Sequence, residues 1–324
     1  MGTAHISANL SQCPHANLRV KRILKRTMMI TTQQIQQYRD EGAVVVPGVL
    51  DEATRLRMKS VLADWVEGSR EVTAHTDLYD LEPGHTAADP RVRRIKKPHL
   101  AHPVFYEFAR SKALTDCLRA LLGPSARLYG SKLNLKAPGF GSPVEWHQDW
   151  AFYPHTNDDI LAVGVMLDDT TLENGAMYVL PGSHTGPTYD HHGADGYFCG
   201  AMDPDTSGLD FSKAVACEGP AGSCSFHHVR AVHGSAQNTS AKPRGLVLYE
   251  VAAVDSFPLL GVSNYDDFKS RLLYGEETVQ PRFREAPVRM PLPPAKNQGS
   301  IYENQTAGKR YFGFADNAPV RAAT

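Results

Sequence analysis

The chain has 324 residues, of which 42% are hydrophobic and 21% charged, a balance typical of a globular protein that buries its own core. Its 34 basic residues nearly match its 35 acidic ones, so a net charge of -1 gives no general attraction for nucleic acid or for a membrane surface. The five cysteines are scattered and without a CxxC pair, which favours reduced thiols in the cytoplasm over a disulfide framework. No apolar run is long enough to span a bilayer.

Residues 1–29 contain no acidic residue and include the basic segment RVKRILKR. An organelle-targeting segment and a tag or upstream start both fit this composition. We favour the second, because Met28 and Met29 stand where a compact domain could begin. We therefore expect a flexible extension over 1–29 and a single domain over 30–324.

Helical patterns dominate the part of the chain that follows. The segment TTQQIQQYRDEG predicts a helix with Thr31 as N-cap, Gln34 completing a capping box and Gly42 at its end. AVVVPGVL predicts a strand, after which Asp51 caps a second helix. Residues 69–100 are expected to be irregular, and VFYEFARSKALTDCLRALLG, over 104–123, predicts one amphipathic helix.

From residue 126 onward short strand patterns replace the helical ones, and Asn174-Gly175 between two of them predicts a hairpin. A proline-rich C-terminal segment is expected to wrap the core or to fray. Helices followed by strands indicate an α+β fold, in which helices buttress one sheet of a β-sandwich core. The strand candidates are ARLYGSKLNLKAP, ILAVGVMLDD, AMYVLPGSH, GSCSFHH and GLVLYEVAAV.

The segment EWHQDWAFYPHTNDD carries the most informative pattern. On a strand, His147 and Asp149 would point to the same face, and with one more histidine they would form the two-histidine, one-carboxylate set that binds Fe(II). HHVRAVHGSAQNTSAKPRG supplies the third candidate, His233, with His227 and His228 as competitors. Arg244 follows His233 by eleven residues, and its guanidinium could grip a carboxylate.

These motifs, in this order and spacing, resemble the phytanoyl-CoA dioxygenase family of Fe(II)- and 2-oxoglutarate-dependent oxygenases. The resemblance runs from about Thr31 to about Val254 and implies a double-stranded β-helix (jelly-roll, cupin-like) core. It implies that His147, Asp149 and His233 hold Fe(II). It further implies that Arg244 and Ser235 bind the distal carboxylate of 2-oxoglutarate, with Asn134 and Lys136 lining that pocket.

The implied reaction consumes O2 and 2-oxoglutarate, releases succinate and CO2, and hydroxylates a small molecule, with ascorbate as a supporting reductant. The presence of Asp149 favours oxygenation over halogenation, because related iron halogenases carry a small residue at that position, which leaves room for a halide. The sequence specifies neither the substrate nor the oligomeric state, and it suggests no nucleic-acid or membrane partner.

Two other functions fit the sequence. A cupin-like metal-dependent hydrolase or isomerase would not need Arg244, and a non-catalytic jelly-roll binding protein would be expected to have lost a ligand.

Among the other candidates, the basic segment RVRRIKKP is interpreted as a solvated loop rather than an anion site. His155, His184, His191 and His192 are interpreted as loop residues, and the aromatic residues around His147 as core, pocket lining, or both.

Overall fold

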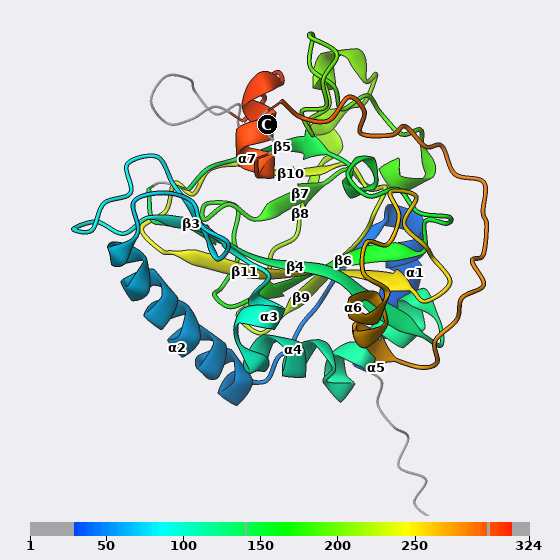
Figure 1. Cartoon of the computed structure of the whole chain (residues 1–324), viewed down its shortest axis with the longest axis horizontal. Coiled ribbons are helices and arrows are strands. Elements are labelled where there is room, and N and C mark those ends of the chain that lie inside the picture. Colours follow the sequence, from blue (N-terminus) through cyan, green and yellow to red (C-terminus); the bar gives the residue numbers. More distant parts are fainter. Residues whose placement is uncertain (1–28, 140, 297–298, 313–324) are drawn as a thin grey trace, which may run out of the picture.

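A computed structural model describes residues 29–139, 141–296 and 299–312 (Figure 1). The expected extension over 1–29 lies almost wholly outside these residues. Within them, no helix is both long and apolar enough to cross a membrane. The helices are α1 Thr32–Glu41, α2 Glu52–Gly68, α3 Pro98–Ala101, α4 Pro103–Ala109, α5 Lys112–Leu122, α6 Tyr265–Ser270 and α7 Ile301–Asn304.

Two antiparallel sheets form the core, and strands distant in the sequence lie side by side in both. The major sheet has eight strands in the order β1 (Ala43–Val46), β9 (Cys224–His228), β6 (Ile160–Met166), β11 (Arg244–Ala253), β4 (Ala126–Lys136), β3 (Val92–Lys96) and β2 (Tyr79–Leu81), with β12 (Leu272–Tyr274) also paired to β4. The minor sheet has the order β5 (Val144–His147), β10 (His233–Ser235), β7 (Met177–Val179) and β8 (Val215–Ala216). This two-sheet α+β architecture confirms the predicted fold class.

The major sheet has one face for the helices and one for the functional site. Helices α2 to α5 lie along its outer face, opposite the minor sheet (Figure 1). On β11, Val247 and Tyr249 pack into the helix-covered core, and the Tyr249 hydroxyl donates to the carbonyl oxygen of Phe105 at 2.7 Å. Leu246 and Leu248, at the alternate positions, line a cavity between the sheets. The same alternation places Asn134 and Lys136 of β4 on the inner face and Leu133 on the outer.

Local capping explains both a correct and an incorrect helix prediction. Helix α1 begins at the predicted capping box, in which Thr31 and Gln34 exchange hydrogen bonds, and ends at Gly42 with φ 80°. The single helix predicted over 104–123 is wrong, because the chain breaks into α4 and α5. The Ser111 side chain accepts from the amide of Leu114 and starts a new helix there.

Two predictions from turn and loop composition are also wrong. Asn174-Gly175 does not close a hairpin, because β6 before it and β7 after it belong to different sheets. Residues 69–100 contain β2, β3 and the start of α3, so the basic segment RVRRIKKP is largely strand β3 rather than a solvated loop. Pairing with the long strand β4 outweighs the polar composition of this segment. Of the proline-rich C-terminal segment, the described part runs over the surface and returns at α7 beside β5 (Figure 1).

Candidate metal and co-substrate site

Strand pairing in the minor sheet brings together two histidines that are 86 positions apart. Strands β5 and β10 are antiparallel, with His233 directly opposite His147. Their ring centroids lie 4.1 Å apart. Gly234 makes this close approach possible, since a Cβ there would meet the carbonyl oxygen of Val144 at 3.0 Å.

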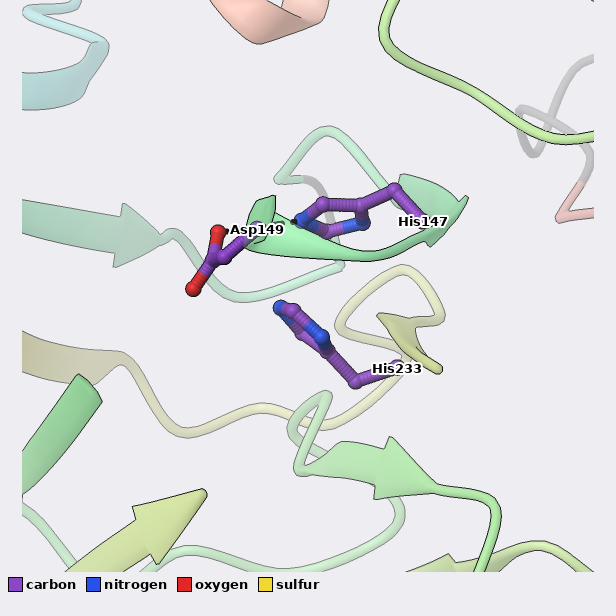
Figure 2. A group of neighbouring side chains, drawn as sticks. All are labelled: His147, Asp149 and His233. Carbon is purple, nitrogen blue, oxygen red and sulfur yellow. Dashed lines mark ion pairs between the residues drawn. The ribbon is translucent and has the colours of Figure 1, made fainter. Parts of the chain in front are cut away.

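Asp149 completes the group from just beyond the end of β5. Gln148 continues the extended backbone, and Asp149 begins a short 3-10 turn instead of lying on the strand as predicted. One potential ligand atom from each of His147, Asp149 and His233 lies within 4.8 Å of the others. Figure 2 shows the three side chains pointing toward a common centre. All three are buried.

Backbone hydrogen bonds orient both imidazoles. Nδ1 of His147 lies 2.7 Å from the carbonyl oxygen of Glu145, and Nδ1 of His233 lies 2.9 Å from that of Ala231. A carbonyl can only accept, so each Nδ1 carries the proton and leaves the Nε2 lone pair free. This arrangement of a fixed tautomer and a free Nε2 is typical of metal-binding histidines.

The three side chains are held in the protonation states that a bound metal cation requires. Burial lowers the pKa of His147 to about 4 and holds that of His233 well below its usual range. Burial alone would raise the pKa of Asp149, but the neighbouring imidazoles of His227 and His233 and the amino group of Lys132 hold it well below its usual range. Two neutral imidazoles and one carboxylate therefore face each other at neutral pH, and this donor set fits a divalent iron ion.

Gln148, which faces away from the metal-binding side chains, holds this part of the chain in place. Its side-chain amide donates to the carbonyl oxygens of Pro187 and Arg230 at 3.0 and 2.8 Å, and its amide oxygen accepts from the Tyr189 backbone. Its own backbone amide donates to Nε2 of His191 at 2.9 Å. His191 lies in a loop as predicted, but it is buried and helps to fix the segment between His147 and Asp149.

A second group of side chains forms the far part of the same cavity. Arg244 begins β11 directly opposite Lys136 of β4, and both line the cavity with Ser235 and Asn134. The Lys136 amino group donates to the Ser235 hydroxyl at 2.9 Å and to the carbonyl oxygen of Ala236. The structure thus brings together all seven residues that the sequence singled out.

Arg244 carries a buried charge without a compensating carboxylate in the described part of the chain. Its Nη2 donates to the carbonyl oxygen of Gly175 at 2.9 Å, whereas Nε and Nη1 are buried with no hydrogen-bond partner there. Burial lowers the pKa of Arg244 to about 10, and burial together with Arg244 lowers that of Lys136 well below its usual range. Unpaired guanidinium nitrogens beside a buried lysine fit a ligand that brings its own negative charge, such as a dicarboxylate.

Gly175 takes part in this arrangement, although it does not form the predicted hairpin. Its φ of 85° is in the left-handed region, and a Cβ would meet the Lys136 side chain at 2.7 Å. A glycine here lets the loop between the sheets approach Lys136 closely and present its carbonyl oxygen to Arg244.

The sequence left several cavity residues unassigned. His227 lies on β9 and lines the cavity, with Nε2 3.4 Å from Oδ2 of Asp149. Phe226, the residue before it, packs in the helix-covered core, so alternation along the strand is the sequence signal that could have placed His227 on the inner face. Arg94 of β3 and Tyr302 of α7 also line the cavity, and no local motif marks either of them. Among the aromatic residues, Trp146 packs in a core cluster, whereas Phe152 lies along an outer hollow beside Asp149.

Two packed antiparallel sheets, with two histidines and a carboxylate meeting between them, define a class of protein: the 2-oxoglutarate-dependent non-haem iron oxygenases. Comparison with known proteins gives the same class. The family model described as phytanoyl-CoA dioxygenase (PhyH) matches residues 38–246, and the chain belongs to this family. The resemblance drawn from the motifs is thereby confirmed, as are the enzyme class and its cofactors, Fe(II) and 2-oxoglutarate.

Individual relatives extend over most of the chain. A Stutzerimonas stutzeri protein named as a probable alpha-ketoglutarate-dependent hypophosphite dioxygenase is 38% identical over 85% of this chain and 97% of its own length. An L-proline trans-4-hydroxylase from Streptomyces griseoviridis is 31% identical over 55% of this chain and 72% of its own. The crystal structure of EctD from S. alaskensis with bound Fe shares the fold, with a TM-score of 0.61, 23% identity, and coverage of 81% of this chain and 90% of that one.

Proposed function

We propose that this dioxygenase hydroxylates a small molecule, and that His147, Asp149 and His233 hold its ferrous ion. The observation that carries this proposal is the convergence of three buried donor side chains with their protons fixed away from the common centre. When bound there with 2-oxoglutarate, iron supplies the activation of O2 and couples substrate oxidation to the release of succinate and CO2.

The chain's own residues bind and orient the reactants. We propose that Arg244 and the Ser235 hydroxyl bind the distal carboxylate of 2-oxoglutarate. Because Ser235 accepts from Lys136, its own proton remains available for the carboxylate. The negative charge of a bound carboxylate would favour the charged form of Lys136 at this end of the cavity, and Asn134 lines its wall. A hydrolase or isomerase would have no use for a buried, unpaired guanidinium at this position.

Hypophosphite, the substrate in the name of the Stutzerimonas stutzeri relative, is the first candidate substrate for this chain. We also infer that residues 30–324 act as one domain, which is supported by a major sheet whose strands run from β1 to β12. A cytoplasmic location is supported by the free, buried thiols of Cys117, Cys199, Cys217 and Cys224.

The test is succinate formation from 2-oxoglutarate by the protein with Fe(II), ascorbate and O2. We expect hypophosphite or another small substrate to raise the rate, with substrate oxidised and succinate formed in equal amounts. An anaerobic control separates oxygenation from hydrolysis or isomerisation, which need no O2. Conversion of substrate without O2, or no succinate with any substrate, would contradict the proposal.

A further inference from the structure

A second hollow adjoins the cavity that holds the proposed iron ligands. Arg94, Lys132, Asp149 and Ile301 line both spaces, so the two meet on the Asp149 side of the proposed metal site. Arg244 and Lys136 line the inner space but not the outer one. With 2-oxoglutarate bound toward Arg244, the outer hollow is the space left for a second small molecule to approach the iron.

The lining of the outer hollow carries an excess of positive charge. Its basic side chains are Arg94, Lys96, Lys97 and Lys132, and its acidic ones are Asp149 and Glu250. Glu250 pairs with Lys132 at 2.9 Å, and Asp149 is assigned to the metal. The remaining basic groups therefore have no carboxylate of this hollow to balance them, and an anion is favoured over a neutral or cationic molecule.

Two neighbouring arginines on β3 differ in their partners. Arg93 is held by carboxylates, with Nη2 3.4 Å from Oδ1 of Asp80 and 3.3 Å from Oε1 of Glu303. Arg94 has no ion pair with any residue that the structure describes; its Nε donates to Oδ1 of Asn134 at 3.0 Å. Its Nη2 is buried without a hydrogen-bond partner in the same part of the chain. A buried guanidinium nitrogen without a partner lacks the acceptor that a bound oxyanion would supply.

The surroundings of Arg94 hold its guanidinium in place before any ligand arrives. Strand pairing sets Arg94 opposite Asn134, and the guanidinium carbon lies 5.0 Å from the ring centroid of Tyr302. Helix α7, which carries Tyr302, is itself tied down, since Glu303 contacts Nε2 of His75 at 2.7 Å. A guanidinium fixed in this way loses little conformational entropy when it binds a ligand.

We propose that Arg94 forms the recognition site for the substrate, and that this substrate is a small anion that offers an oxygen to the guanidinium, either an inorganic oxyanion or a carboxylate. This inference rests on the proposed function and specifies the substrate class of the same site. Arg94 binds the oxyanion through its free Nη2, and the anion lies on the Asp149 side of the iron.

The test is calorimetric titration of the Fe(II)- and 2-oxoglutarate-loaded protein under anaerobic conditions, so that binding is measured without turnover. The probes are hypophosphite as inorganic oxyanion, formate as carboxylate, and formamide as neutral analogue of formate. The variant is Arg94→Gln. Its matched control is Arg91→Gln, which removes an arginine three residues earlier that pairs with the exposed Asp89.

We expect at least one anion to bind wild type roughly tenfold or more tightly than formamide, and Arg94→Gln to weaken that anion about ten- to a hundredfold. Arg91→Gln should bind the anions and 2-oxoglutarate as wild type does, and in Arg94→Gln the loss of anion affinity should exceed any loss of 2-oxoglutarate affinity. If Arg94→Gln does not fold, Arg94→Lys serves, because it keeps the charge and loses the fork; unchanged anion affinity in it would overturn the inference.

Three other results would also overturn it: formamide binding as tightly as both anions, no binding of either anion, or a loss in Arg94→Gln confined to 2-oxoglutarate. The relative affinities of hypophosphite and formate then show whether the site prefers an inorganic oxyanion or a carboxylate. Failure of wild type to bind 2-oxoglutarate is a distinct result, which would refute the proposed function itself.

Discussion

Replacing Arg244 with methionine should change two properties of the protein in opposite directions. The guanidinium is buried, keeps one hydrogen bond to the carbonyl oxygen of Gly175, and has two further nitrogens without a partner in the described residues. Burial lowers its pKa from 12.5 to about 10, which corresponds to a free-energy penalty of about 3 kcal/mol on the charged form. Methionine removes this penalty, but it also removes the hydrogen bond to Gly175, which is worth about 1 to 1.5 kcal/mol. We therefore expect metal-free Arg244→Met to be more stable than wild type by about 1 to 2 kcal/mol in urea denaturation.

The same variant should lose most of its affinity for 2-oxoglutarate. Each hydrogen bond between charged groups is worth about 1.5 to 3 kcal/mol, so loss of a bidentate pair should raise the Kd about a hundredfold or more. Arg244→Lys is the control, because it keeps the buried charge without the fork, and it should fall between wild type and Arg244→Met in affinity. A less stable Arg244→Met protein with unchanged 2-oxoglutarate affinity would show that Arg244 serves only the fold.

Three further predictions follow from the same cavity and its surroundings. His147→Ala and Asp149→Ala should each abolish succinate formation while circular dichroism shows the fold retained; appreciable turnover in either would exclude that residue as a ligand. Lys136→Met should weaken 2-oxoglutarate binding about tenfold, because it removes an amino group that donates to the Ser235 hydroxyl and that the bound carboxylate would keep charged; calorimetry would detect this effect, and unchanged binding would contradict it. Burial lowers the pKa of His155 to about 4, so the unfolded chain takes up the proton first as the pH falls. The stability contributed by the neutral, buried imidazole is present above about pH 6.5 and decreases by about 3 kcal/mol toward pH 4. The free energy of unfolding of His155→Phe should therefore depend less on pH than that of wild type. Identical pH profiles of the two proteins would refute this prediction.

Local signals in the sequence were sufficient for several features that are decided locally, although the Ser111 cap that separates α4 from α5 was missed. The capping box at Thr31 and Gln34 predicts the start of α1, because both hydrogen bonds form within one turn of chain. The strand pattern of β4 predicts that Lys136 and Leu133 face opposite sides, because side chains alternate along any strand. The motifs around His147, Asp149 and His233 indicated a metal set because their order and spacing resemble those of the family to which the chain belongs.

Pairing between distant strands decided the features that the sequence did not predict. RVRRIKKP is basic enough to suggest a solvated loop, yet it forms β3 because β4 offers a long edge beside it. Arg94 consequently lies in the cavity, which no property of its immediate neighbours indicates. The Asn174-Gly175 turn does not close the predicted hairpin, because a turn signal does not show whether the chain returns to the same sheet. Asp149 lies past the end of its strand for a similar reason, since β5 ends where its pairing with β10 ends.

Anaerobic titration of the Fe(II)-loaded protein with 2-oxoglutarate, followed by the absorption of the iron-to-keto-acid charge-transfer band, tests the proposed site most directly. We expect the band to appear and saturate in wild type, and to be lost in His233→Ala, whose missing imidazole lies opposite His147 across the minor sheet. Absence of the band from folded, iron-loaded wild type, or its full retention in His233→Ala, would contradict the assignment of this site.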